Sequence, residues 1–128
     1  MRVPVLGNWA RSRAEHGALG TLSKADMLAF GGVGITGALT SATRAFRTLA
    51  TSEHLADHGP ELHRLVRDAS PAGRIYAARL LAKLRPGDQS VWAPLLEDDA
   101  VVTTAEGCIF DQVSVQLAVA GRMRSWDV

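Results

Sequence analysis

The sequence predicts a mainly all-α protein of short stacked helices with α-solenoid character, and it allows one small β-hairpin near residues 101–110. Its 128 residues suit a single domain that buries a core of its own. Aromatic residues make up only 5% of the chain, so this core must be built mainly from Leu, Val, Ile and Ala. Alanine-rich apolar stretches pack as closely spaced helices more readily than as β-sandwiches.

The first residues are predicted to lie outside this helical stack. We divide the chain into an amino-terminal extension (1–22) that is irregular or forms a short helix, a single helical domain (23–122) and a frayed tail (123–128). Within the extension, residues 9–15 predict a short helix, because Gly17 and Gly20 favour a helix end.

Two further helices are predicted before residue 50. Ser23-Lys-Ala-Asp26 has the shape of a capping box and indicates a short helix through Phe30. The next helix should begin at Thr40 or Ser41, because the apolar residues that follow have helical spacing. The glycine-rich stretch between these two helices is expected to join them.

Prolines mark the starts of the following helices. Residues 60–68 and 71–84 each begin with proline, which favours the first helical position, and Ser70 can cap the second of these helices. Farther on, Ser90 can cap a helix that carries Pro94 in its first turn, where a missing amide breaks no internal hydrogen bond.

The chain then changes from helical to β-branched character. Residues 101–104 read as a strand, 105–107 as a turn and 108–110 as a possible returning strand. Asp111 can cap a last helix that runs to about Gly121. Apart from this hairpin, successive helices have the dimensions of stacked helical hairpins.

Three stretches resemble small bacterial proteins with HEAT-like helical repeats: SPAGRIYAARLLAKL (70–84), VTTAEGCI (102–109) and GITGALTSATRAFRTL (34–49). The resemblance covers roughly residues 24–118. It implies a helical scaffold and brings no catalytic residues with it, and a shared fold does not establish a function.

The stretch FGGVGITG (30–37) contains the pattern Gly-x-Gly-x-x-Gly, which also occurs in dinucleotide-binding turns. Such a site needs a strand before the glycines, and a second parallel strand after the helix that follows them. A helix does follow, and Asp57 lies about 20 residues beyond Gly37, as that pattern requires. However, residues 23–30 read as a helix and 53–67 are polar and helix-like. We therefore interpret the glycines as a flexible or close-packed joint.

Charge is unevenly distributed along the chain. Residues 63–85 carry six basic residues and one acid, whereas residues 86–111 carry six acids and no base. Neighbouring patches of opposite sign are suited to steering a protein partner. We predict that the partner-binding residues are Arg64, Arg67, Arg74, Arg79, Lys83, Trp92, Asp98 and Asp99.

Two of these residues also have structural interpretations. Arg74 lies in the first turn of its helix, where a cation opposes the helix dipole, so it is expected to pair with Asp98 or Asp99. Trp92 can be a binding anchor, but tryptophan is also a routine core residue, and the core role is favoured.

Two alternative functions stay open. The basic residues of 64–85 could follow nucleic-acid phosphates, although a pI of about 8.0 is below the usual signature of such proteins. His54 and His58 have the i, i+4 spacing of zinc helices, and His63 or Glu61 could complete a site for a metal-dependent hydrolase. Because Gly59-Pro60 ends that helix directly after His58, we expect solvent-exposed histidines and no metal.

Cys108 is the single cysteine, and it has no evident activating neighbour, so we interpret it as a small buried residue. A single cysteine and the lack of a leader-like or membrane-spanning apolar run indicate a cytoplasmic protein. The sequence as a whole favours a non-enzymatic protein-interaction module, of adaptor or immunity type, with no cofactor.

Overall fold

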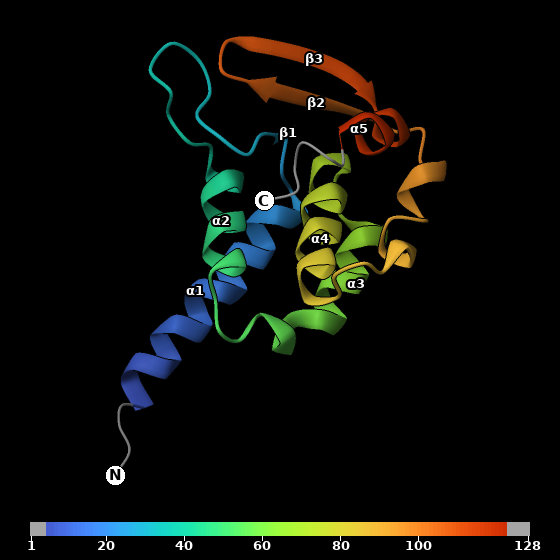
Figure 1. Ribbon diagram of the computed structural model, residues 1–128. Coiled ribbons are helices and arrows are strands. Elements are labelled where there is room, and N and C mark those ends of the chain that lie inside the picture. Colours follow the sequence, from blue (N-terminus) through green and yellow to red (C-terminus); the bar gives the residue numbers. More distant parts are fainter. Residues whose placement is uncertain (1–4, 123–128) are drawn as a thin grey trace.

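The computed structural model describes residues 5–122, and the side chains of residues 11–120. Its elements run in the order α1 (Val5–Ser23), β1 (Met27–Leu28), α2 (Ser41–Ala50), the 3-10 helix η1 (Leu55–His58), α3 (Gly59–Asp68), α4 (Pro71–Leu84), the 3-10 helices η2 (Gln89–Val91) and η3 (Leu95–Glu97), β2 (Val101–Glu106), β3 (Ile109–Ser114) and α5 (Val115–Arg122). The strands lie across one end of the α1, α2 and α4 helices (Figure 1).

The three strands form one mixed sheet in the order β1-β2-β3. β1 pairs in parallel with β2, with Met27 opposite Thr103, and β2 pairs antiparallel with β3 over six residues of each strand. The prediction of an all-α solenoid is therefore wrong, although the hairpin that it allowed is present. In a solenoid each repeat contacts only its neighbours, whereas here a strand near residue 27 pairs with one beyond residue 100.

The amino-terminal helix is much longer than the predicted helix over 9–15. α1 continues through Gly17 and Gly20 to Ser23, and it buries Leu19 and Leu22 against the core. A glycine inside a helix costs about 1 kcal/mol relative to alanine. Burial of each leucine contributes about 1.5–3 kcal/mol and outweighs that cost.

The predicted capping box at residues 23–26 is also wrong. Ser23 is the last residue of α1, where its hydroxyl donates to the carbonyl of Gly20 at 2.7 Å. The chain then turns into β1, where Leu28 is buried. The hydroxyl of Ser70 donates to the carbonyl of Ala25 at 2.7 Å, and so fixes this turn to the start of α4.

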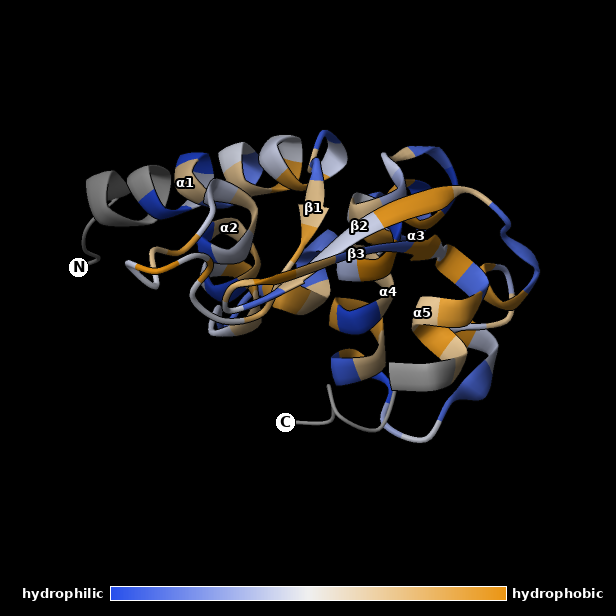
Figure 2. Cartoon of the chain, turned by 90° about the horizontal axis from the view of Figure 1, so that it is seen from above, coloured by the Kyte–Doolittle hydropathy of each residue, from blue (hydrophilic) through white to orange (hydrophobic). Residues whose placement is uncertain are grey.

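α4 buries eight of its residues and forms the centre of the core. Figure 2 shows α4 between α2 and α5, with both apolar and hydrophilic residues along it. Its fully buried Tyr76 reaches the chain just after β1, where its hydroxyl donates to the carbonyl of Ala29 at 2.5 Å and accepts from the Ala29 amide at 2.8 Å. Thr43 of α2 donates to the same carbonyl at 2.7 Å. Burial is the main reason that the pKa of Tyr76 is raised. These bonds hold α2, α4 and β1 together at one buried point.

The helix starts with local capping signals are confirmed. The hydroxyl of Thr40 accepts from the Thr43 amide at the start of α2, and that of Ser70 accepts from Gly73 at the start of α4. α3 begins at Gly59, with proline in its first turn. The predicted helix capped by Ser90 is wrong, because the chain forms η2 and η3 there instead.

The predicted cap of the last helix is wrong as well. Asp111 lies within β3, and α5 begins only at Val115, whose amide donates to the carbonyl of Ala100 at 2.8 Å. The hairpin thus extends beyond the predicted 101–110. None of the helices that the structure describes is both long enough and apolar enough to cross a membrane.

Candidate protein-binding surface

The basic residues predicted to bind a partner do not share one face. Arg64 pairs with Glu61 of its own helix, α3, and Arg67 is exposed farther along that helix. The Arg64 side chain is half exposed, and an ion pair of this kind on a helix surface contributes little to stability. On α4, Arg74 and Arg79 are five residues apart, so they project roughly 140° apart around the helix axis.

Arg79 packs against an aromatic ring. Its guanidinium carbon lies 5.9 Å from the centroid of the Phe30 ring, and Phe30 in turn packs edge-on against Phe46 and Tyr76. Lys83 is exposed near the end of α4. This group therefore presents no continuous track of cations of the kind that a phosphate backbone needs.

Arg74 forms the ion pair that the sequence predicted. Its Nη1 lies 2.7 Å from Oδ2 of Asp98, and its Nε donates to the carbonyl of Ala69 at 2.9 Å. The other carboxylate oxygen of Asp98 accepts from the Ala100 amide at 3.0 Å. The pair links the start of α4 to the segment between η3 and β2, whereas Asp99 is exposed.

Trp92 lies in the core, with 6% of its surface exposed. This placement corresponds to the routine core role, and the residue has too little exposed surface to contact a partner. Of the eight residues predicted to bind a partner, Trp92 is thus buried, Arg74 and Asp98 bind each other, and Arg79 covers Phe30.

The prediction of solvent-exposed histidines is confirmed for His54 and His63 and is wrong for His58, which is buried. His54 precedes the short 3-10 helix η1, and His58 is its last residue and is buried. His63 is exposed on α3. In the part of the chain that the structure describes, no group of three His, Cys, Asp or Glu side chains is arranged to hold a metal ion.

His58 instead binds a buried carboxylate of α1. Its Nε2 lies 2.8 Å from Oε1 of Glu15, which is 4% exposed, and the Ser52 hydroxyl donates to Oε2 of Glu15 at 2.6 Å. Burial alone would raise the pKa of Glu15, but the hydrogen bonds from Ser52 and His58 and the charge of His58 outweigh burial and hold this pKa below its usual value.

The order in which Ser52, Glu15 and His58 are hydrogen-bonded determines whether Ser52 could act as a nucleophile. A serine nucleophile needs the imidazole at its own oxygen, with the acid on the far side of the ring. Here the carboxylate of Glu15 lies between Ser52 and His58, and Ser52 also accepts from the His54 amide at 3.0 Å. The arrangement ties α1 to the segment around η1 and does not activate the serine.

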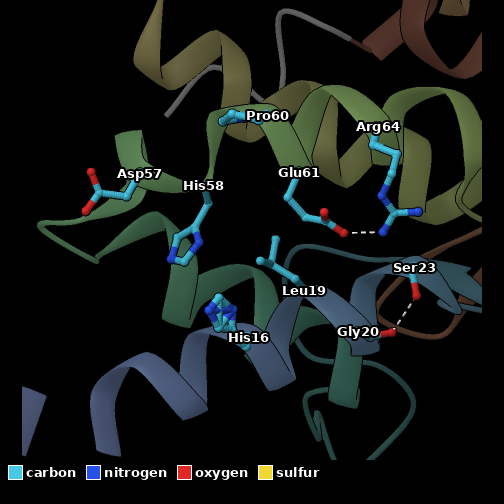
Figure 3. Close-up of a pocket in the computed structure, with 9 residues that line it drawn as sticks. All are labelled: His16, Leu19, Gly20, Ser23, Asp57, His58, Pro60, Glu61 and Arg64. Carbon is cyan, nitrogen blue, oxygen red and sulfur yellow. Dashed lines mark hydrogen bonds and ion pairs between the residues drawn. The ribbon is translucent and has the colours of Figure 1, made fainter. Parts of the chain in front are cut away.

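A shallow pocket of about 490 Å³ opens beside this cluster, between α1, η1 and α3. Figure 3 shows the rings of His16 and His58 facing each other across one end of the pocket, where they make an edge-to-face contact with centroids 5.5 Å apart. At the other end, Glu61 and Arg64 bind each other. The polar groups of its lining are therefore largely engaged with one another.

Large exposed apolar side chains gather at the tip of the hairpin. Ile109 is 67% exposed and Phe110 is 50% exposed, both at the start of β3, and Ile35 is 97% exposed in the turn after β1. We call these three residues the apolar tip. Cys108 is exposed in the hairpin turn, so its interpretation as a buried residue is wrong.

Backbone hydrogen bonds lock the two turns of the apolar tip together. The Gly34 amide donates to the carbonyl of Gly107 at 2.8 Å, and the Val33 amide donates to Ala38 across the base of the turn, also at 2.8 Å. Ile35 and Ile109 lie one and two residues from this junction. The turn thus keeps the Ile35 side chain exposed to solvent, and within the described chain this side chain is almost entirely uncovered.

The same turn contains the Gly-x-Gly-x-x-Gly pattern, and its structure differs from that of a dinucleotide-binding turn. A strand, β1, does precede the glycines, contrary to the prediction of a helix there. However, α2 begins only at Ser41, and the Gly34 and Gly37 amides already donate to carbonyls of the chain. A phosphate-binding turn needs such amides free at the start of a helix, so the motif forms a close-packed turn.

Sequence reasoning missed Ile35, Ile109 and Phe110. For Ile109 and Phe110 a sequence signal was available, because both are large apolar residues close to the hairpin turn at Gly107. Comparison of the chain with protein-family models, with curated proteins and with solved structures finds no match.

Proposed function

We propose that this protein is a non-enzymatic interaction module, of the adaptor or immunity type, and that it binds a protein partner through the apolar tip. The observation that carries this proposal is the near-complete exposure of Ile35 in a turn fixed by the Gly34–Gly107 hydrogen bond. A rigid apolar side chain held in water loses little conformational entropy when a partner covers it.

The free energy gained by burying one of these side chains is large enough for a binding anchor. Full burial of an isoleucine or phenylalanine side chain contributes about 1.5–3 kcal/mol. Interfaces usually depend on a few such buried anchors, surrounded by contacts that exclude water. Ile35 in the turn after β1 can supply one anchor, and the start of β3 can supply another. Ile109 and Phe110 are consecutive in this strand, so they point to opposite faces of the sheet and only one of them shares a face with Ile35.

Exposed charges can assist the encounter. Glu97 and Asp99, and Arg64 and Arg67 on α3, are exposed, of opposite sign and outside the apolar tip. The field of such charges can raise the rate of association and orient the partner before contact. In this proposal the charges steer, and the apolar tip provides the affinity.

The arrangement of polar groups supports a binding role over a catalytic one. Ser52 is not placed next to an imidazole, and Glu15 and His58 bind each other within the protein. We place the protein in the cytoplasm, where an exposed single thiol such as Cys108 stays reduced.

The test is affinity capture from a native lysate with matched variants. I35S and F110S should lose a protein partner that the wild-type chain retains after nuclease treatment and a high-salt wash. L117S is the control, because Leu117 of α5 is 62% exposed but lies outside the apolar tip. Capture of the same partner by all variants would contradict the proposal, and so would recovery of nucleic acid that high salt removes.

A further inference from the structure

We infer that β3 is a self-association edge, at which a second copy of this chain pairs antiparallel with β3 to give one continuous six-stranded sheet. The inference concerns the edge of the sheet, whereas the proposed partner site is the apolar tip at its end. The two share Phe110, but the partner site rests on the exposed Ile35 and the self-association rests on the backbone edge of β3, so their failures can be told apart.

The first observation is an open edge. β3 is the last strand of the sheet, and within residues 5–122 no strand or bridge pairs with its outer side. A strand edge presents a row of backbone amides and carbonyls that can template pairing with another chain.

The second observation is that this edge lacks the usual protection. Proteins guard edge strands with proline, bulges, several charges or short length. β3 has six residues, IFDQVS, with no proline and a single charged side chain, Asp111. Its pairing with β2 is continuous from Ile109 to Ser114, so no bulge turns the edge away.

The third observation is that β3 complements itself in one register. In an antiparallel pair of identical edges, one residue lies opposite its own copy at the two-fold axis. Only two centres pair five residues of the strand: Asp111, which pairs 109–113, and Gln112, which pairs 110–114.

Charge selects between these two registers. A centre at Asp111 would place two carboxylates opposite each other, which is destabilising. A centre at Gln112 places two amides opposite each other, and each amide has both donors and an acceptor. Asp111 then faces Val113 of the second copy, and Phe110 faces its Ser114.

This register leaves Ile35 and Ile109 of each copy outside the paired residues 110–114, whereas Phe110 lies within them, opposite Ser114 of the second copy. The two hairpin turns point in opposite directions, and Cys108 of one copy lies eight residues along the strand from Cys108 of the other, or about 27 Å at 3.4 Å per residue. The pair would thus present two partner sites at opposite ends of one sheet.

The test is sedimentation equilibrium of the wild-type protein from about 10 µM to about 1 mM, the range expected for an interface smaller than the standard size. The mass should rise toward that of a dimer. Q112D and Q112K should each remain monomeric, because like charges then meet at the axis, and an equimolar mixture of the two should dimerise. Q89D, at an exposed glutamine outside the sheet, should behave as wild type.

A nitroxide on Cys108 gives an independent readout of the register. Pulsed dipolar spectroscopy of the wild-type dimer should show a distance of roughly 25–35 Å, once the label length is added to the backbone separation. A wild-type protein that stays monomeric up to 1 mM would overturn the inference. So would a Q112D/Q112K mixture no more dimeric than either variant alone, or a label distance far from this range.

Discussion

The amide of Gly34 donates a hydrogen bond of 2.8 Å to the carbonyl of Gly107, and this bond joins the turn after β1 to the turn of the β2–β3 hairpin. Both glycines have positive φ, 77° at Gly34 and 59° at Gly107, which other residues adopt only with strain. The exposed position of Ile35 therefore depends on backbone geometry that glycine makes possible.

The first prediction concerns Gly32, at the base of this turn. In G32A, the added methyl group would collide with the backbone of Gly37, so the turn must shift. We expect a loss of at least about 1 kcal/mol in unfolding free energy, with changed amide shifts at Gly34 and Gly107. The control is G31A, where a methyl group meets nothing within 4 Å. Equal stability of both variants would contradict the account of the turn.

The second prediction concerns the buried hydroxyl of Tyr76. Y76F removes the acceptor of the Ala29 amide, which would be left unpaired in the core, while Thr43 still donates to the Ala29 carbonyl. An unsatisfied buried group costs about 1–3 kcal/mol, and guanidinium denaturation should show this loss. T48A removes an exposed hydroxyl–carbonyl bond and should change stability by less than about 0.5 kcal/mol. A Y76F variant as stable as T48A would contradict this role.

The third prediction concerns the ion pair of Arg74 and Asp98. A double-mutant cycle with R74A and D98A should give a coupling energy of about 0.5–3 kcal/mol, because both side chains are mostly buried and also bind backbone groups. D99N, at the exposed neighbour, should be close to neutral. Additive effects of R74A and D98A would show that the pair does not stabilise the fold.

The fourth prediction is a pH dependence set by Glu15. Its pKa is lower in the folded protein than the ordinary value of 4.5, so the unfolded chain takes up the proton first as pH falls. The ionised Glu15 carboxylate therefore stabilises the fold above about pH 4.5, and this stabilisation is lost as pH falls through the pKa of Glu15 in the folded protein. In urea denaturation from pH 7 downward, the free energy of unfolding should fall less with pH for E15Q than for wild type, and S52A should lie between them. Parallel curves for E15Q and wild type would refute this role of Glu15.

Local signals predicted the elements that local interactions define. Ser70 and the proline after it fix the start of α4, and β-branched residues predict β2. The two-residue strand β1 has no periodicity of its own. It exists because β2 pairs with it and Tyr76 binds the next residue, Ala29, and both partners are distant in the chain. Residues 23–30 alone therefore predicted a helix.

In the candidate site, too, local features were predictable from the sequence and long-range contacts were not. The Arg74–Asp98 pair was predictable, because the helix dipole disfavours a cation in the first turn and a nearby acid offsets this cost. The pairing of Glu15 with His58 spans 43 positions and leaves no pattern in the sequence. The exposure of Ile35 depends on contact between two turns, which only the folded chain defines.

The most direct test of the central claim is site-specific photo-crosslinking in the native cell. A photoreactive amino acid at position 35 should give a discrete adduct with a protein partner, and the same group at position 117 or 67 should not. Both control positions are exposed, on α5 and on α3. Adducts from position 67 with none from position 35 would contradict a partner site at the apolar tip and would place the binding site on α3.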